Sequence, residues 1–308
     1  MKVVDHLSDF EKLEYAVVTI GTFDGVHIGH KTILRRLVEE AKENNGKSVL
    51  ITFWPHPRFI LKKDADKLKL LTTFEEKVEI VKELGVDYIL KIAFTPQFSN
   101  LSADEFVRKI LVDQVGTKQL FIGYDHHFGN NREGNIQFLQ EHSSPYGFAV
   151  NEISKQEIDH IGVSSTKIRN TLESGEIHLA NSLLGRNYSI CGKVVDGNKK
   201  GKSLGFPTAN IHVSETYKLL PADGAYAIKA FVRGFEYLGM LNIGFKPTVD
   251  GRERTIEAHL FNFEEDIYGQ EVRVEFVKAL RKEMKFDSLE ALKEQLNKDK
   301  EIALSILT

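Results

Sequence analysis

The stretch Gly21-Thr22-Phe23-Asp24-Gly25-Val26-His27-Ile28-Gly29-His30 decides the fold of the first half of the chain. The apolar, largely β-branched segment 16–20 precedes it and predicts a buried strand. Apolar residues recur at helical spacing through 33–41 and predict a helix after it. A glycine-bearing turn between strand and helix presents free backbone N–H groups at a helix N-terminus, where phosphate is favoured. His27 and His30 fall on one side of that first turn, where imidazoles can donate hydrogen bonds to a triphosphate.

The composition is that of an ordinary globular protein of 308 residues, long enough for two domains. Charged residues make up 28% of the chain and the net charge is only -3, which argues against nucleic acid as a partner. The single cysteine, Cys191, excludes an internal disulfide and a cysteine-based metal cage. Because no apolar run approaches ~18–20 residues and no charged-then-apolar leader opens the chain, we expect no membrane association and a cytoplasmic location.

Strands and helices alternate up to residue 184. Further strands are predicted at 48–53, 88–92, 118–123 and 148–153. A helix over 74–84 is followed by Gly85 as its C-cap, and Ser102 with Glu105 forms a capping box that opens another helix. This alternation predicts a doubly wound α/β fold with a mostly parallel sheet, in which ligands bind beyond the carboxyl ends of the strands.

Three further polar stretches follow strands or open a helix. His56 lies in the WPHP sequence after the second strand, and Asp125 lies in GYDHHFG after the fourth. Each has an ordinary interpretation, as a loop histidine and a solvated turn aspartate. The sequence 164–166 with Arg169 is first an N-cap cluster beside a surface charge. The same hydroxyls, backbone N–H groups and arginine on one helical turn would also form a phosphate clamp.

Beyond residue 184 the pattern changes to short strands separated by turns. The candidates are 188–195, 225–232, 237–243, 255–261 and 272–276, which predict a small antiparallel barrel. A final helix begins near Ser288, and its apolar stripe is expected to pack on the core. We therefore predict two domains, 1–184 and 185–308. The stripe comprises Leu289, Leu292, Leu296, Ala303 and Leu307.

The segment 197–210 carries the chemical information of the second half. Its glycines and lysines suit an anion, although a flexible basic hairpin would have the same composition. Thr208 and Asn210 offer oxygen ligands at strand spacing, a pair that can hold Mg²⁺ together with its waters. In 255–261, Glu257 and His259 alternate with apolar residues and face away from them, so Glu257 could take a proton from a hydroxyl.

The first set of motifs, GTFDGVHIGH, TFWPHP, GYDHHFG and VSSTKIR, resembles in order and spacing the FAD synthetase module of the HxGH nucleotidylyltransferases. The resemblance implies that His27, His30 and Arg169 contact the ATP phosphates in a catalytic role. The chain departs from the family pattern at His126-His127, where an aromatic and a variable, often basic residue are usual. The other implied nucleotide or flavin contacts are Gly21, Phe23, Asp24, Gly29, His56, Asp125, Ser164, Ser165 and Thr166.

The second set, LGFPTAN, GAYA, NIGFKPT, IEAHLFNFEEDIYG and LRKEMKFDSL, resembles the riboflavin kinase module. It implies that Thr208 and Asn210 bind Mg²⁺ with ATP, and that Glu257 is the general base for the flavin ribityl hydroxyl. Together the motifs resemble bacterial bifunctional riboflavin kinase/FAD synthetases, with riboflavin, FMN and ATP as small-molecule substrates, FAD as product and a monomeric or weakly oligomeric state. The remaining implied ligand contacts are Gly201, Lys202, Gly205, Pro207 and Arg281.

Three alternatives stay open. The chain could be active at one site only, most simply as a kinase if His126-His127 disrupts the first pocket. It could be a flavin- or nucleotide-binding regulator, although such a protein would not need Glu257. A tRNA-linked role, suggested by the letters HIGH, is disfavoured because no basic anticodon-type domain follows.

Overall fold

The computed structural model describes residues 1–61, 67–123, 126–153, 162–197, 205–248 and 251–308. The described contacts group the chain into two compact units, Met1–Ser165 and Thr166–Thr308. Helices α8 (Ser165–Glu173) and α9 (Ile177–Leu184) therefore group almost entirely with the second unit. The change in the sequence from helical spacing to short strands comes later, near residue 184. The domain boundary at residue 184 stays a prediction.

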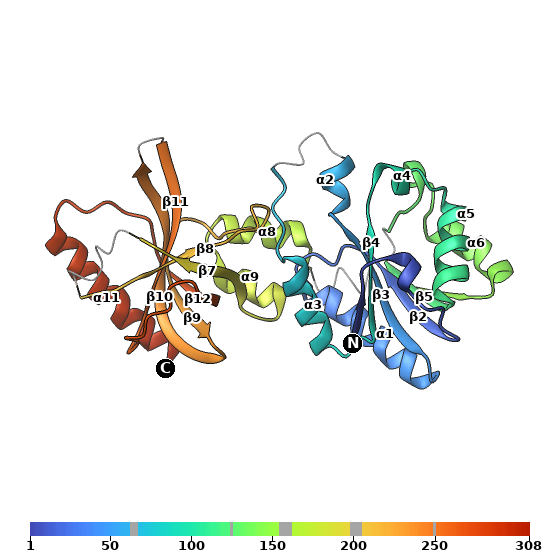
Figure 1. Ribbon diagram of the computed structural model, residues 1–308, viewed down its shortest axis with the longest axis horizontal. Helices are drawn as coiled ribbons and strands as arrows, with labels where there is room; N and C mark the ends of the chain where they lie inside the picture. The colour runs from blue at the N-terminus through green and yellow to red at the C-terminus, as the bar shows by residue number, and fades with distance from the viewer. Residues whose placement is uncertain (62–66, 124–125, 154–161, 198–204, 249–250) are drawn as a thin grey trace. The chain divides into compact units, whose positions relative to one another are not determined.

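The first unit is built on a six-stranded parallel sheet in the order β1-β4-β3-β2-β5-β6 (Figure 1). This confirms the doubly wound α/β prediction. The strands that follow the signature lie within one or two residues of their predicted ranges, and the short first strand was not predicted. Their bounds are β1 (Lys2–Val4), β2 (Ala16–Ile20), β3 (Lys47–Trp54), β4 (Tyr88–Ala93), β5 (Thr117–Gly123) and β6 (Ala149–Ile153).

Helices cover both faces of this sheet, because alternate side chains of each strand point to opposite faces. Leu34 and Leu37 of α1 pack with Leu50 of β3 in one cluster, and neighbouring Ile51 joins Ile110 in the other. These side chains are at most 2% exposed. The described helices are α1 (Ile28–Glu43), α2 (Pro57–Leu61), α3 (Phe74–Glu83), α4 (Pro96–Ser99), α5 (Ala103–Phe106), a π-helix (Val107–Val115) and α6 (Ile136–Tyr146), with 3-10 turns at Leu7–Asp9 and Asn130–Arg132.

The predicted helix ends are confirmed. Gly85 follows α3 with φ +82°, and both hydrogen bonds of the Ser102–Glu105 capping box are present. The helix continues beyond Phe106 as a π-helix, which the sequence did not indicate because its apolar spacing is that of an α-helix.

The chain order creates a switch point beside β2. From β2 the chain runs outward through β3 and β4, and then returns to β5 on the other side of β2. The pairing is direct, since Thr19 lies opposite Phe121 and its hydroxyl donates to the Phe121 carbonyl at 3.0 Å. Ligands of doubly wound sheets bind beyond the carboxyl ends of such strands. The signature therefore stands at the switch point.

We expect Gly116→Ala to destabilise the first unit much more than Gly147→Ala. Both glycines have φ near +75°, at +77° and +73°, so alanine costs about 1 kcal/mol of backbone strain at either site. A Cβ on Gly116 would lie 2.1 Å from the Leu13 carbonyl oxygen, whereas a Cβ on Gly147 would meet nothing within 4 Å. The backbone clash adds roughly 2 kcal/mol. Urea denaturation of the two variants measures the difference, and equal midpoints would contradict this account.

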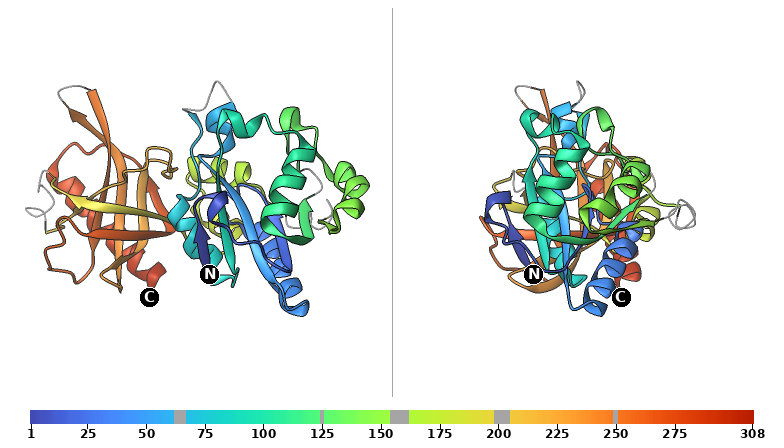
Figure 2. Two further views of the ribbon diagram at one scale, coloured as in Figure 1. Left: turned by 45° about the vertical axis from the view of Figure 1, so that its right-hand side comes forward. Right: turned by 90° about the vertical axis from the view of Figure 1, so that its right-hand side faces the viewer.

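The second unit is a closed barrel with the strand order β10-β11-β8-β7-β12-β9, and every pairing between the strands is antiparallel (Figure 2). This confirms the barrel prediction and adds β8, which was not among the predicted strands. The strand bounds are β7 (Tyr188–Val195), β8 (Ala209–His212), β9 (Gly224–Val232), β10 (Phe235–Thr248), β11 (Gly251–Leu260) and β12 (Glu271–Lys282).

Several details of the second unit differ from the sequence prediction, since β10 runs to Thr248 rather than to 243 and β11 begins at Gly251 rather than at 255. Strand β12 runs to Lys282 rather than to Phe276, because irregularities in its pairing with β9 break the two-residue alternation after Phe276. Helix α11 (Leu289–Leu307) begins where predicted, with Ser288 accepting a hydrogen bond from the Ala291 N–H. Its first residue, Leu289, is 64% exposed and does not belong to the packed stripe. The α11 residues that pack with Ala227 and Met240 of the barrel are Leu296, Ala303, Leu304, Ile306 and Leu307, so Leu292 of the predicted stripe is not among them either.

Candidate functional site

The two signature histidines lie together at the start of α1. His27 is the N-cap residue, and its Nδ1 accepts a hydrogen bond from the backbone N–H of His30 at 3.3 Å. The two rings stack with their centroids 3.6 Å apart and their planes 15° apart. The prediction that both rings share one side of the first turn is confirmed. Because Nδ1 of His27 accepts, the proton of the neutral ring lies on Nε2.

The protonation state of His30 is set by its surroundings. Burial is the main cause that lowers the pKa of His30 well below its ordinary value, and His27 and Lys77 lower it further. Nδ1 of His30 is buried and has no hydrogen-bond partner among the described residues. His30 is therefore neutral near pH 7. A bound polyphosphate would favour the protonated form of His30.

Close packing around the turn explains its residue types. A Cβ on Gly29 would lie 3.2 Å from Val163 and 3.3 Å from Nδ1 of His27, so glycine leaves room for the histidine ring over the helix. Phe23 and Val26 have positive φ angles of 46° and 37°, which non-glycine residues seldom adopt. Such strain is held by surrounding contacts and clusters at functional sites. The Phe23 ring packs on the His30 ring at 4.7 Å.

Asp24 anchors the signature turn to the segment before α3. Its carboxylate accepts hydrogen bonds from the backbone N–H groups of Leu71 at 2.9 Å and Thr72 at 3.2 Å. The Gly25 N–H donates to the Thr72 hydroxyl at 3.2 Å, and the Ser165 hydroxyl donates to the Asp24 carbonyl at 3.0 Å. The side chain of Asp24 is thus committed to holding the turn, and its predicted ligand contact stays a prediction.

A cavity of about 570 Å³ opens beside the signature turn at the carboxyl edge of the sheet. Gly21 lines it together with His56, which is 8% exposed and whose Nδ1 accepts from the Arg58 N–H at 3.1 Å. His126 and His127 line it as well, so the segment in which the chain departs from the family pattern lies at the cavity. Sequence reasoning missed most of its aromatic and basic lining. The missed residues are Phe53, Arg58, Phe94, Phe98, Phe106, Phe128 and Arg132.

The aromatic lining had a signal that could have been used. Phe94 and Phe98 directly follow the third predicted strand, at the same sheet edge as the signature. Their rings lie 5.7 Å apart, and each is 5.7 Å from the ring of Phe53. Such a cluster offers flat apolar faces for a planar ring system.

The remaining predicted residues of the first site fall into two groups. Ser164 is exposed, Ser165 contacts the signature turn as described above, and Thr166 and Arg169 lie in the first two turns of α8. Asp125 lies outside the described residues. The proposed phosphate contacts of these residues stay predictions.

The barrel places Thr208, Asn210 and Glu257 together. Asn210 of β8 lies directly opposite Glu257 of β11, and the Thr208 hydroxyl donates to the Glu257 carboxylate at 3.4 Å. Across β11 from Asn210, Asn242 of β10 also lies directly opposite Glu257. Opposed residues of antiparallel strands share a face, so Glu257 stands between two amide side chains. Glu257 is half-buried.

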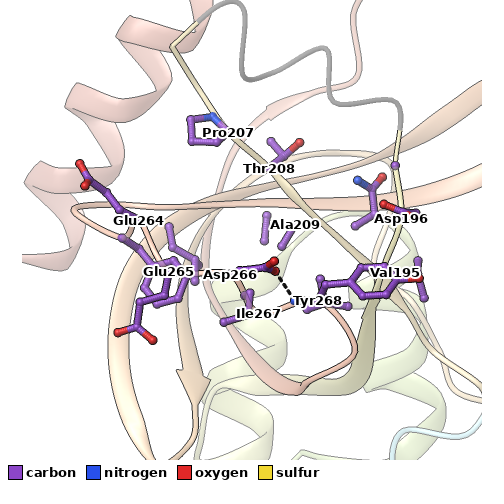
Figure 3. A pocket seen from close by; sticks show the side chains of 16 residues that line it. Val195, Asp196, Pro207, Thr208, Ala209, Glu264, Glu265, Asp266, Ile267 and Tyr268 are labelled. Carbon is purple, nitrogen blue, oxygen red and sulfur yellow. Dashed lines mark hydrogen bonds between the residues drawn. The ribbon is translucent and has the colours of Figure 1, made fainter.

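A second cavity, of about 580 Å³, lies at this end of the barrel (Figure 3). Pro207, Thr208 and Asn210 line it, and Asn210 packs so closely that a Cβ on Gly197 would lie 1.9 Å from its amide nitrogen. Figure 3 shows Asp196 and Tyr268 on one side of the cavity and Glu264 on the other. Asp196 directly follows β7, whereas Glu264 and Tyr268 belong to the loop before β12, which the sequence analysis quoted only within the motif IEAHLFNFEEDIYG.

The other residues predicted for the second site have mixed outcomes. The Arg281 guanidinium contacts the Asp299 carboxylate of α11 at 3.0 Å, and Asp299 is 2% exposed, so Arg281 joins β12 to α11. Gly205 has a backbone φ of +83°. Gly201 and Lys202 lie outside the described residues. His259, which was predicted to face away from Ile256, Ala258 and Leu260, is buried on its own face of β11. It is 8% exposed, its Nδ1 lies 2.8 Å from the Pro207 carbonyl, and burial lowers its pKa.

Within the described ranges, no group of three or more histidine, cysteine or acidic side chains is arranged to hold a metal ion. None of the helices in the part of the chain that the structure describes is long and apolar enough to cross a membrane.

Comparison with known proteins matches both halves of the chain. The FAD synthetase family model matches residues 9–167, and the riboflavin kinase family model matches residues 184–307. A bifunctional riboflavin kinase/FMN adenylyltransferase of Buchnera aphidicola is 40% identical over 98% of this chain and 97% of that protein. A protein of the same name from Haemophilus influenzae is 39% identical and covers 94% of each chain.

A solved structure agrees with this alignment along the whole chain. The crystal structure of a Streptococcus pneumoniae protein described as a macrolide-efflux protein is 29% identical, with a TM-score of 0.89 over 98% of both chains. The two family models match the two halves of the chain, and the curated relatives match nearly its whole length. Both halves are therefore assigned. The chain therefore belongs to the family of bifunctional riboflavin kinase/FMN adenylyltransferases.

Proposed function

We propose that this chain makes FAD from riboflavin in two ATP-dependent steps, each at its own site. The barrel transfers the γ-phosphoryl group of ATP to riboflavin and gives FMN. The α/β unit joins the AMP part of ATP to the phosphate of FMN and gives FAD and pyrophosphate. The observation that carries the proposal is that each unit has a cavity beside its candidate catalytic residues: Gly21 of the signature turn lines the first, and Thr208, which contacts Glu257, lines the second.

In the adenylylation step, a phosphate oxygen of FMN attacks the α-phosphorus of ATP, and the bond to the β-phosphate breaks. The stacked pair of His27 and His30 donates hydrogen bonds to the phosphates and stabilises the charge that develops on pyrophosphate. The aromatic cavity beside Gly21 holds the isoalloxazine ring of FMN. Arg58 and Arg132, which line this cavity, suit the FMN phosphate. No covalent intermediate is needed, because the site acts by positioning and charge.

In the kinase step, the Glu257 carboxylate removes the proton of the ribityl 5′-hydroxyl as its oxygen attacks the γ-phosphorus. Its place opposite Asn210 and its contact with the Thr208 hydroxyl support this role, because both put the carboxylate beside the residues that border the ATP cavity. The cavity lined by Pro207 and Thr208 takes the ATP.

Thr208 and Asn210 would hold Mg²⁺ with the phosphates of ATP. The hydroxyl and amide oxygens are hard ligands, and the Glu257 carboxylate lies 3.4 Å from the Thr208 hydroxyl, so the donor set fits this ion. Mg²⁺ neutralises phosphate charge where it is bound. The ion arrives with the nucleotide, because two neutral protein ligands are too few to retain it alone.

We therefore expect the purified, nucleotide-free protein to hold no stoichiometric metal. Elemental analysis after dialysis should find well under one metal ion per chain, and both activities should return when Mg²⁺ and ATP are added together. One zinc ion per chain, retained through dialysis, would contradict the proposal.

One assay separates the proposed function from its alternatives. The chain is incubated with riboflavin, ATP and Mg²⁺, and FMN and FAD are separated by chromatography. Both products support the proposal, FMN alone indicates a kinase only, and neither product with retained flavin binding indicates a regulator. A cytoplasmic location, a monomeric or weakly oligomeric state and the lack of a nucleic-acid partner stay predictions.

A further inference from the structure

Lys77 is a buried lysine that the proposed mechanism leaves unused. It lies in α3, one turn after the N-cap residue Thr73, and is 4% exposed. Lysine is almost never buried unless a partner compensates its charge. Burial lowers the pKa of Lys77 to about 8, and the nearby charge of Asp24 acts in the opposite direction. Its ammonium group is therefore mostly charged at pH 7 and mostly neutral at pH 9.

A chain of hydrogen bonds joins Lys77 to the signature turn. The Lys77 Nζ donates to the hydroxyl of Thr52 at 3.4 Å, and this hydroxyl lies 3.4 Å from the carbonyl oxygen of Thr22. A threonine hydroxyl has one proton, so Thr52 donates to Thr22 and accepts from Lys77. The chain thus runs in one direction, from α3 through β3 to the turn.

A second connection runs through Asp24. Its carboxylate is held by the backbone N–H groups of Leu71 and Thr72, directly before α3, and is attracted to Lys77 from there. Segment 71–77 thus holds the turn through backbone hydrogen bonds and through the electrostatic attraction between Lys77 and Asp24. A buried carboxylate that loses its nearby cation is costly, so removing the charge of Lys77 would loosen the turn.

Lys77 also acts on His30. Its charge is one of the causes that lower the pKa of His30, after burial and His27. Among the described residues, Asp24 and His30 are the titratable groups coupled to Lys77, and Lys91 of β4 lies near the same Phe74 ring. The Nζ atoms of Lys77 and Lys91 are 6.0 Å and 4.6 Å from the Phe74 centroid. Lys91 is paired with Asp5, whereas Lys77 is attracted to Asp24 of the turn.

We propose that Lys77 is a positioning residue of the FMN adenylyltransferase reaction: its buried cation holds the signature turn through Asp24 and Thr52 and repels a further positive charge on His30. The proposal rests on the placement of the ATP phosphates at the histidine pair. Lys77 does not contact the substrate, and it acts through the three side chains named here.

The test is the pH profile of FAD formation from FMN and ATP between pH 6.5 and 9.5. The stabilisation of the signature turn by the Lys77 cation is complete well below the pKa of about 8, and it is lost as the pH rises through that value. We expect kcat/KM for ATP of the wild type to fall on the order of tenfold from pH 7 to 9. For Lys77→Met, kcat/KM should be low at pH 7 and should not change between pH 7 and 9. For Lys77→Arg, kcat/KM should keep the wild-type value of pH 7 over the same range, because arginine keeps its charge.

Two controls separate this role from a general loss of structure. Lys82→Met changes an exposed lysine of the same helix and should keep the wild-type profile. Riboflavin kinase activity, measured on the same preparations, reports folding of the other unit and should not change in any variant. In addition, an NMR titration of the ring protons should show a higher pKa for His30 in Lys77→Met, which a purely structural loss does not require.

The outcomes are decisive in each direction. A Lys77→Met variant with the wild-type profile and wild-type KM for ATP would overturn the proposal. If that variant does not fold, a decline of Lys77→Arg that parallels the wild type would overturn it, and so would a wild type without any fall between pH 7 and 9. His30→Ala distinguishes a failure of this proposal from a failure of the proposed function. If His30→Ala keeps full FAD formation, the ATP phosphates do not lie at the histidine pair.

Discussion

His30→Ala should reduce FAD formation from FMN by at least about 100-fold, the usual effect of removing a donor that stabilises transition-state charge. The ring of His30 stacks on His27 at the N-terminus of α1, so its loss removes one donor and the packing that orients the other. FMN formation from riboflavin should stay within about twofold of the wild type, because the barrel carries its own site. Separate assays with riboflavin and with FMN measure the two rates.

His6→Ala is the matched control for this variant. His6 is exposed and belongs to the same unit, and its removal should leave both rates unchanged. A folded His30→Ala protein that lost both reactions would contradict the assignment of separate sites. A protein that kept full FAD formation would show that the histidine pair does not serve the phosphates.

Glu257→Gln should have the opposite selectivity. Glutamine keeps the size of the side chain and can still contact Thr208, but it has no basicity. The loss of a general base typically lowers the rate by 10²–10⁴-fold, so we expect FMN formation to fall by at least about 100-fold. FAD formation from added FMN should be unchanged.

Glu271→Gln serves as the control, because Glu271 is an exposed strand glutamate of the same barrel. It should keep both activities. Normal FMN formation by Glu257→Gln would mean that the ribityl hydroxyl loses its proton to another group, and the role proposed for Glu257 would be discarded.

The sequence by itself determined the elements and their class. The β-branched run before the signature, the capping box at Ser102 and the glycine at 85 are local signals, because capping and strand burial depend on near neighbours. The short turns after residue 184 predicted the barrel in the same way. The motifs then placed the two chemistries in the two halves.

Elements whose register depends on distant partners were predicted less well. The pairing of β12 with β9 contains irregularities, so its alternation fails after Phe276 and the strand was predicted too short. Strand β8 is four residues long and gains its hydrogen bonds from β7 and β11, which are distant in sequence. Nothing local marks such a strand.

Only the tertiary structure decided which side chains meet. The aromatic cavity combines Phe53, Phe94 and Phe128 from three strand ends, and the neighbours of each are set by the strand order rather than by spacing along the chain. Lys77 is the clearest case. On a helix whose neighbouring positions are charged it has the pattern of an exposed residue, yet α3 packs it against Thr52 and near Asp24. The cost of burying its charge is offset by groups that only the folded sheet brings within reach, and for that reason sequence alone could not assign it.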